Sequence, residues 1–455
     1  MNAPESVDVV IVGAGFAGLT AAHDLVNQGY SVVVLEGRDR VGGRVLTGEI
    51  AGVKVDLGGT WVAKEHDAIR AIADQVGCTT VKQFVEGRST LWLAGKRSTY
   101  KGTIPRLSPA ALVNMTRIQT ALDKLAKTVD VDAPWNSPRA AELDAITLEE
   151  WLDRKRARTT TRAMMTIVTK VEFGCQTSDV SLLHMLRTIR AFGGVDHMLD
   201  AEGGMQDARY VETTQEIAVR YAALLGDRVH TNSPVRRITQ DADGVTVDTD
   251  TAQFQAKYAI VTTATEHRAG IKFEPALPGT AQSMIGSWGL GALSKAFVAY
   301  DKPFWRAEGL SGEALTDTGT VFITFDVSPR PNGPGILMAF CDPRVFDAHS
   351  PEVRKAQVVK QLTDLYGAEA ASPIDYIDQC WRTDDFAPGG PNPVVGPYAS
   401  VRYGSVLTEP HGRVHWAGTE TAGEWTGSMN GAVLSARRVS GEVAELLTDS
   451  LATTN

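Results

Sequence analysis

The sequence predicts an α/β fold, and three observations support that prediction. Two short apolar runs, residues 7–12 and 31–35, are typical of buried parallel strands, and residues 19–25 between them have helical apolar spacing. Residues 109–190 have mostly helical patterns, after which strand patterns return. Residues 414–447 repeat the order strand, glycine turn and helix. A chain that begins and ends in the same kind of unit suggests one discontinuous domain with a second domain inserted into it.

Length, composition, net charge and cysteine spacing limit the functions that the protein can have. The 455 residues suit two or three domains, and 43% apolar with 22% charged residues is the mixture of a soluble globular protein. The net charge of -9 leaves no basic stripe for phosphates, so we expect no nucleic-acid partner. The four cysteines have neither CxxC nor metal-ligand spacing, which indicates reduced thiols and no metal site. With no signal peptide or spanning segment apparent, we expect a cytoplasmic protein without membrane contact.

A glycine motif follows the first predicted strand directly. Gly13-Ala-Gly15-Phe-Ala-Gly18 fits GxGxxG, in which the glycines permit a tight turn, close approach to a pyrophosphate and close packing of helix on strand. The pyrophosphate would lie at the positive end of the helix that starts there. Glu36 closes the second strand, where its carboxylate can accept hydrogen bonds from a ribose diol. The order of these parts favours a dinucleotide site over a plain glycine turn, and the acid argues against NADP.

The residues after Glu36 favour FAD over NAD. Gly42 and Gly43 stand between arginines in Arg38-Asp-Arg40-Val-Gly42-Gly43-Arg44, as suits a loop that is pressed onto a pyrophosphate. Arg44 would add a charge-assisted contact to that group. Gly58-Gly59 is a second pair of close-approach glycines, here beside an aromatic residue. A solvated basic turn would not explain these glycine pairs.

At this point the sequence resembles the flavin-containing monoamine oxidase family, and in particular bacterial amine oxidases of the cyclohexylamine oxidase type. Motifs in family order span nearly the whole chain. Besides those above they are Ile271-Lys-Phe-Glu-Pro275-Ala-Leu-Pro278, Leu293-Ser-Lys295, Lys302-Pro-Phe-Trp305, His415-Trp416-Ala-Gly418-Thr-Glu420-Thr and Trp425-Thr-Gly427-Ser-Met-Asn-Gly431-Ala. The combination is specific, although each piece alone is not.

The resemblance implies a fold and a set of contacts. A Rossmann-like FAD-binding domain (1–80, 205–295 and 385–455) is expected to be interleaved with an α+β substrate-binding domain (81–204 and 296–384). The cofactor-binding residues that it implies are Gly13, Gly15, Phe16, Ala17, Gly18, Glu36, Gly37, Arg38, Gly42, Gly43, Arg44, Gly58, Gly59, Thr60, Trp61, Val235, Trp381, Gly418, Glu420, Ser428 and Met429. Among these, Val235 matches a backbone contact to the adenine. Lys295 matches the catalytic lysine that holds a water against the reactive flavin nitrogen, and its apolar neighbours disfavour a surface role.

Two departures from the family pattern affect the flavin and the amine. Gly390 stands where mitochondrial monoamine oxidases have the cysteine that attaches the flavin, so we expect noncovalent FAD. The two tyrosines that frame the amine in those enzymes match Pro391 and Ser428, although a shift of one residue would place Asn392 instead of Pro391. Trp381 and Trp425 are candidate replacements, with core packing as the alternative for both.

The expected substrate pocket is apolar except for one acid. Ile323, Phe325, Met338 and Phe340 match pocket-lining positions and favour an alicyclic or arylalkyl amine over a polyamine. Glu172 falls near a position that is usually uncharged. It could bind a second ammonium group or form an interdomain salt bridge, and the salt bridge is favoured. No arginine is clearly placed to hold an α-carboxylate, although an amino-acid substrate stays open.

The function that follows is oxidative deamination of an amine. Hydride leaves the α C–H for the flavin, water hydrolyses the imine, and dioxygen reoxidises the flavin with release of hydrogen peroxide. No side-chain general base is apparent, so the ammonium is expected to lose its proton on entry to a low-dielectric site. The competing interpretations are a flavin dehydrogenase or desaturase, an amino-acid or diamine oxidase, and a non-enzymatic flavin-binding module. A homodimer is possible.

Overall fold

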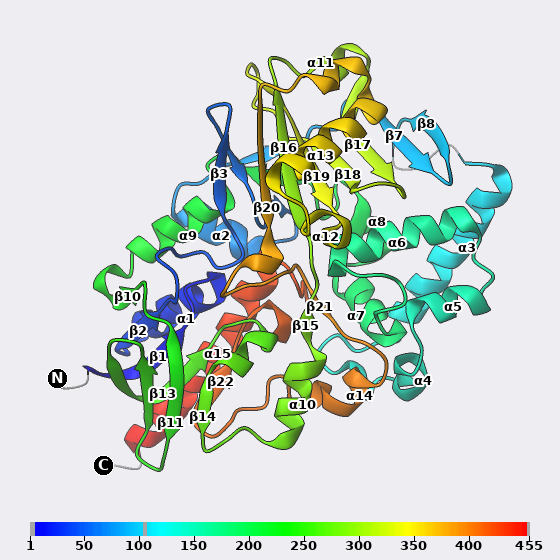
Figure 1. Ribbon diagram of the computed structural model, residues 1–455. Coiled ribbons are helices and arrows are strands. Elements are labelled where there is room, and N and C mark those ends of the chain that lie inside the picture. The colour runs from blue at the N-terminus through cyan, green and yellow to red at the C-terminus, as the bar shows by residue number, and fades with distance from the viewer. Residues whose placement is uncertain (1–4, 103–106, 453–455) are drawn as a thin grey trace.

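The computed structural model describes residues 5–102 and 107–452, and its largest sheet is built from both ends of the chain. The blue helix α1 (Phe16–Asn27) and the red helix α15 (Met429–Ala452) in Figure 1 pack against each other on one face of this sheet. The strand order is β10 (Val229–His230), β2 (Val32–Leu35), β1 (Glu5–Val12), β13 (Gln253–Val261), β12 (Val245–Thr249), β11 (Val235–Gln240) and β14 (Lys272–Glu274), and β22 (Val414–Trp416) also pairs with β13.

The centre of this sheet is parallel. Strand β1 pairs in parallel with β2 and with β13, and β13 pairs in parallel with β22. Side chains Val9 to Val12 are all buried, as expected for a strand with helices on both faces. Helices α9 (Thr214–Ala223) and α2 (Asp67–Gln75) share the core of α1 and α15. Strand β22 and helix α15, near the end of the chain, thus join the sheet and core that the N-terminal segment begins.

A second sheet is built from the middle of the chain. Its order is β20 (Asp375–Cys380), β16 (Ser294–Tyr300), β19 (Gly335–Cys341), β18 (Val321–Asp326), β17 (Leu310–Thr316), β7 (Arg88–Leu93) and β8 (Lys96–Tyr100). All its neighbouring strands are antiparallel except β17 and β7. Helices α13 (Pro351–Tyr366), α11 (Phe304–Ala307) and α12 (Pro343–Phe346) pack on one face. The boundary that the sequence placed between residues 295 and 296 falls inside β16.

The predicted helical region forms a separate layer, on the right in Figure 1. It consists of α3 (Pro109–Ala126), α4 (Ala140–Asp144), α5 (Leu148–Arg154), α6 (Thr159–Phe173), α7 (Leu182–Ala191) and α8 (Val195–Leu199). Local sequence fixes several boundaries: Thr147 and Glu150 form a capping box at α5, Ser181 caps α7, and Gly174 ends α6 in the left-handed conformation. An apolar core joins these helices to one another.

Short strands connect the two sheets. β5 (Trp61–Val62) and β6 (Thr80–Lys82) pair with β9 (Ala208–Tyr210), β3 (Thr47–Ile50) pairs with β4 (Val53–Asp56), and β15 (Gly289–Leu290) pairs with β21 (Pro393–Val394). α10 (Gly279–Ser287) and α14 (Ala399–Tyr403) pack beneath the large sheet. The predicted fold class, a Rossmann-like α/β unit interleaved with an α+β unit, is confirmed. Within residues 5–102 and 107–452, no helix is both long and apolar enough to cross a membrane.

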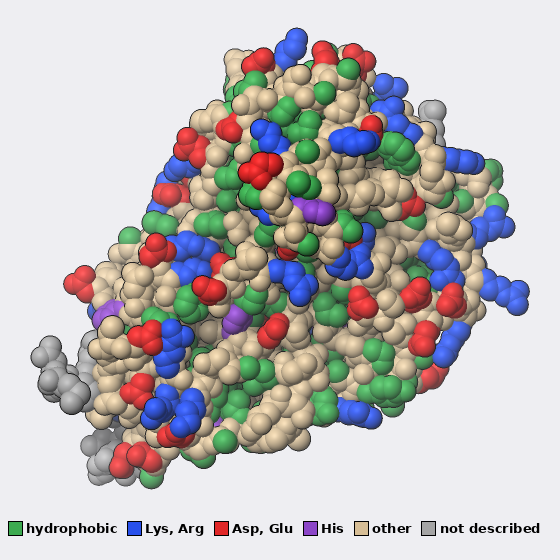
Figure 2. Space-filling view, in the orientation of Figure 1, with side chains coloured by type: hydrophobic (Ala, Val, Ile, Leu, Met, Phe, Trp, Pro, Cys, Tyr) green, Lys and Arg blue, Asp and Glu red, His purple; other side chains and the backbone are tan. Residues whose placement is uncertain are grey.

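Surface charge is mixed over the face shown in Figure 2, where Lys and Arg side chains alternate with Asp and Glu. Several exposed charges of the protein are paired, for example Arg236 with Asp250 at 2.8 Å and Lys360 with Asp364 at 2.7 Å. Such exposed pairs contribute little to stability. No group of His, Cys, Asp and Glu side chains in the described part of the chain is arranged to hold a metal ion.

Candidate active site

A cavity of about 420 Å³ opens where the parallel strands of the large sheet end. Gly13 follows β1, Glu36 follows β2, Thr262 follows β13, and all three residues line the cavity. Gly418, two residues beyond β22, lines it too. Parallel strands bring their carboxyl ends to one edge of a sheet, which is where α/β proteins bind their ligands. The topology of the sheet therefore assembles residues that lie up to about 400 positions apart.

The glycine motif has the geometry that a pyrophosphate needs. Gly13 has a φ of +101°, and a Cβ on Gly18 would lie 1.9 Å from the Gly13 carbonyl oxygen, so both positions require glycine. A Cβ on Gly15 would meet only the Cα of Gly43, at 4.0 Å, so the space in front of Gly15 is cavity. Helix α1 has no side-chain cap at its N-terminus. Its first N–H groups are thus available to an anion.

Glu36 is held in place by two backbone N–H groups. Its Oε2 accepts from the Ala14 N–H at 2.8 Å and its Oε1 accepts from the Arg38 N–H at 3.0 Å. The carboxylate is buried yet lines the cavity, and each oxygen keeps a second lone pair. These residues fit a dinucleotide with a diol at this end of the cavity.

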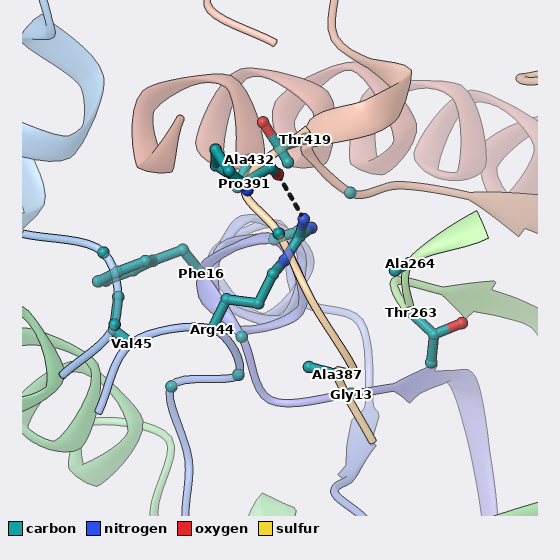
Figure 3. A pocket seen from close by; sticks show the side chains of 18 of the residues that line it. Gly13, Phe16, Arg44, Val45, Thr263, Ala264, Ala387, Pro391, Thr419 and Ala432 are labelled. Carbon is teal, nitrogen blue, oxygen red and sulfur yellow. Dashed lines mark hydrogen bonds between the residues drawn. The ribbon is translucent and has the colours of Figure 1, made fainter. Parts of the chain in front are cut away.

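Arg44 crosses the cavity, as Figure 3 shows. Its guanidinium donates to the Pro391 carbonyl at 3.0 Å and pairs with Glu420 at 2.7 Å. Glu420 itself is buried and does not line the cavity, so its contact with the cavity is through Arg44. Gly18 does not line the cavity either, because it packs against Gly13 and Thr262. Ser428 lines the cavity and accepts from the Gly431 N–H at 3.0 Å, which caps helix α15.

The cavity brings together most of the sequence-predicted residues. Those that line it are Gly13, Gly15, Phe16, Ala17, Glu36, Gly37, Arg38, Gly42, Gly43, Arg44, Gly58, Gly59, Thr60, Trp61, Glu172, Val235, Lys295, Phe340, Trp381, Pro391, Gly418, Ser428 and Met429. No cysteine is among the described lining residues, and a Cβ on Gly390 would lie 3.6 Å from the Arg44 side chain.

Lys295 lies on β16 with its ammonium buried at the cavity wall. It donates to the Gly58 carbonyl at 2.5 Å, to the Thr60 Oγ1 at 2.7 Å and, less directly, to the Asp56 carbonyl at 3.3 Å. Its nitrogen also lies 5.4 Å from the centre of the Trp61 ring. Burial lowers the pKa of Lys295, and the Asp56 carboxylate opposes that effect. A water molecule can bind the ammonium only in exchange for one of its protein acceptors, of which the Asp56 carbonyl is the farthest.

Three of the four predicted pocket residues lie behind the cavity wall. Ile323, Phe325 and Met338 are buried in the second sheet and do not line the cavity, whereas Phe340 does. The Phe325 ring packs against Trp61 at 4.8 Å, which separates it from the open space. The expectation that Ile323, Phe325 and Met338 line the pocket is therefore wrong, and of the four predicted residues Phe340 alone does so.

The two tryptophans considered for the amine cage have different positions. Trp381 lines the cavity, and its indole N–H donates to the Leu57 carbonyl at 2.9 Å. Trp425 is not in the lining, because it packs against His66 and Phe192 with ring centres 4.8 and 6.3 Å apart. Core packing, the alternative named for Trp425, matches its place.

Glu172 corrects one expectation. Within residues 5–102 and 107–452 its carboxylate has no ion pair, so the favoured interdomain salt bridge is wrong. The side chain is 5% exposed and lines the cavity. Burial raises the pKa of Glu172 to about 8. An acid in such surroundings is largely neutral near pH 7.

Sequence reasoning missed several lining residues. Phe192, Met205 and Gln206 come from the helical layer and the segment after it, and His66 precedes α2. None of them belongs to a motif or to a position whose spacing marks it. Thr262 could have been found, because the predicted strand at residues 258–262 runs parallel to β1 and ends at the same edge.

Comparisons with known proteins agree with this site. The family model for flavin containing amine oxidoreductases matches residues 16–444. The flavin-containing monoamine oxidase AofH of Mycobacterium tuberculosis is 48% identical over 446 residues, which cover 98% of each chain. A flavin-containing amine oxidase of Oncorhynchus mykiss is 32% identical over 97% of this chain and 87% of its own.

Solved structures are similar over the whole chain. Putrescine oxidase bound to putrescine superposes with a TM-score of 0.94 at 28% identity, over 97% of this chain and 100% of that one. Cyclohexylamine oxidase from Brevibacterium oxydans superposes with a TM-score of 0.92 at 29% identity, over 97% and 99%. A nucleotide cradle at the strand ends, a buried lysine beside it and a family match along almost the entire sequence lead to one conclusion: this chain is a member of the flavin-containing amine oxidoreductase family.

Proposed function

We propose that this protein is an amine oxidase that binds FAD noncovalently, oxidises an alicyclic or arylalkyl amine and uses dioxygen as its electron acceptor. The observation that carries the proposal is the continuity of the cavity, whose lining runs from Glu36 and Val235 at the nucleotide end to Val171 and Phe192 in the helical layer. One space thus adjoins both a dinucleotide cradle and a largely apolar compartment.

The residues of the nucleotide end would hold FAD by distinct contacts. The first N–H groups of α1 would bind the pyrophosphate, Glu36 would accept from the ribose hydroxyls, and Val235 would face the adenine. Gly390 stands where related enzymes have the anchoring cysteine, and the described lining holds no thiol. Both observations support noncovalent binding. FAD, when bound, accepts a hydride from the amine and passes its electrons to dioxygen, so the products are an imine and hydrogen peroxide.

The protein's own part is to bind, orient and dehydrate the amine. Phe340 and Trp61 line the cavity on the side of the second sheet, and Phe192 and Met205 line it on the side of the helical layer. These side chains exclude water, so an amine held among them prefers its neutral, oxidisable form. The Lys295 ammonium supplies a fixed positive charge at the wall, which would stabilise the anion that forms as dioxygen takes up its first electron.

Lys295 and the apolar lining favour an oxidase of small, mostly apolar amines over the alternatives. A desaturase would use the same cradle, so the distinction rests on which substrate reduces the flavin. The test is anaerobic mixing of the purified holoenzyme with a panel of cyclohexylamine, arylalkyl amines, putrescine, amino acids and non-amine alcohols. We expect bleaching of the flavin band by the first two classes, and release of peroxide when air is admitted.

Control measurements decide between the candidates. If putrescine gives the highest kcat/KM, the assignment of substrate class is refuted while the oxidase assignment stands. If no amine bleaches the flavin, the amine oxidase proposal itself fails.

A further inference from the structure

We propose that Glu172 is a catalytic residue, which pairs with the ammonium group of the arriving substrate and takes its proton. The proposal rests on the proposed function and goes beyond it, because amine oxidation needs a neutral amine whereas amines near pH 7 are cations. The step uses the ionised form of Glu172, whose share rises as the pH approaches 8: one N–H bond of the ammonium breaks and one O–H bond forms on the carboxylate. The two opposite charges are neutralised together, and the proton returns to solvent after the product has left.

The carboxyl lies in the cavity and has no partner there. It is 5% exposed, and within residues 5–102 and 107–452 no side chain or backbone group donates a hydrogen bond to it. Removing a carboxylate from water without a partner is expensive, so such groups are rare in ordinary cores. An unpartnered acid that faces a ligand cavity is explained if its partner arrives with the ligand. An amine substrate brings a cation to this place.

The position of Glu172 is fixed by the backbone around it. A Cβ on Gly174 would lie 2.2 Å from the Ala292 carbonyl oxygen, and a Cβ on Gly291 would lie 1.5 Å from the Phe173 carbonyl oxygen. The end of α6 is therefore pressed against the segment that leads into β16 and Lys295. The Asn392 side chain also donates to the Glu172 carbonyl at 3.1 Å, which ties it to the loop that carries Pro391. Glu172 thus sits on a rigid part of the wall.

The charges on the neighbouring elements are already committed elsewhere. On α6 itself, Lys170 pairs with Asp342 at 3.0 Å. On α7, Arg187 donates to the carbonyls of Val131 and Ala422, at 2.9 and 2.6 Å.

The remaining titratable groups nearby also leave Glu172 without a counter-charge. His184 on α7 bonds the Pro393 carbonyl, and burial lowers its pKa to about 3, so it is neutral. His66 on the cavity wall is neutral for the same reason, with its pKa lowered to about 3. Lys295 on β16 donates to Gly58 and Thr60. No described residue forms an ion pair with this carboxyl, and a cation that enters the cavity can supply the missing partner.

In this cavity the pKa of Glu172 and the pKa of a substrate amine should approach each other. Burial raises the pKa of Glu172 to about 8, with no charged neighbour contributing. The same kind of environment lowers the pKa of Lys295, which is itself a primary amine. A substrate amine in the cavity should be affected in the same direction, and transfer between groups of similar pKa costs little. The carbonyl end of α6, which is partly negative, further favours a cation at this place.

The test is the pH dependence of kcat/KM for cyclohexylamine or a benzylamine in wild type and in Glu172→Gln. In wild type we expect an acid limb that belongs to Glu172. The variant can use only the fraction of the amine that is already neutral in solution. The acid limb of its kcat/KM profile should therefore move to the pKa of the free amine. At pH 8 this predicts a loss of roughly 10²-fold for an amine of pKa ~10.4, and the loss should shrink toward pH 10.5.

Ring-substituted benzylamines of different basicity make the test sharper. The acid limb of the variant should follow the pKa of each amine, whereas the limb of wild type should stay in place. Glu313→Gln is the matched control, because burial raises the pKa of Glu313 to about 7 but the residue does not line the cavity. It should leave the profile unchanged. Flavin content and melting temperature establish that each variant is folded.

Two results would overturn the inference. One is a profile of Glu172→Gln that parallels wild type at every pH, since the residue would then take no proton. The other is a loss confined to diamines, which would assign Glu172 to a second ammonium group. Both leave flavin reduction by amines intact, so they are distinguishable from failure of the proposed function.

Discussion

Glu172→Gln is also expected to make the protein more stable at alkaline pH. In the unfolded chain the carboxyl ionises near its ordinary value of 4.5, whereas in the folded protein its pKa is raised to about 8 by burial. Between these values the folded state binds one proton more than the unfolded state. The free energy of unfolding must therefore fall as pH rises through this interval, and glutamine, which cannot ionise, removes that loss.

The magnitude follows from the width of the interval. Each pH unit corresponds to about 1.4 kcal/mol, so the full cost is about 4–5 kcal/mol above pH 8. This is an upper limit, because the carboxyl faces a cavity that admits water. For a chain of this length the melting temperature should rise by several degrees.

The assay is the melting temperature of both holoproteins from pH 4.5 to pH 9 at one scan rate. The difference between variant and wild type should be near zero at pH 4.5, grow steadily and level off above pH 8. Glu313→Gln should behave in the same way but level off near pH 7, because its pKa is raised only to about 7. A difference that does not change with pH would refute the assignment of a buried, unpartnered carboxyl.

Three further predictions concern the cofactor. Acid precipitation should release intact FAD to the supernatant, since Gly390 offers no thiol; yellow colour in the pellet would contradict this. Glu36→Ala should weaken FAD binding by roughly 1–3 kcal/mol, because it leaves the Ala14 N–H and the ribose without an acceptor; unchanged affinity in a fluorescence titration would remove Glu36 from the ribose. Lys295→Met should retain FAD but slow reoxidation by dioxygen about 10²-fold or more in stopped-flow mixing, because the fixed charge is lost. Reoxidation at the wild-type rate would mean that Lys295 does not act in the oxygen step.

The nucleotide-binding unit was predictable because its determinants are local. Gly13, Gly15, Gly18 and Glu36 lie within about 25 residues and belong to a single strand–turn–helix–strand unit. The φ of +101° at Gly13 and the close approach of Gly18 to that residue are consequences of this short segment alone. The family motifs further along the chain extended the prediction to the cavity as a whole, including Lys295.

Only the tertiary structure decided what each pocket residue faces. Residues on one face of a strand share a side of the sheet, but whether a side chain meets open space depends on what packs over it, and Trp61 covers Phe325 from a different sheet. The ion-pair partner of a charged residue such as Glu172 is likewise decided only by the tertiary structure. A salt bridge needs a partner within about 4 Å, and the charged side chains near Glu172, most of which come from distant parts of the chain, are already engaged elsewhere. The sequence by itself determined the cradle, because local sterics fix it, whereas the partners of buried side chains depend on contacts that form only when the whole chain is folded.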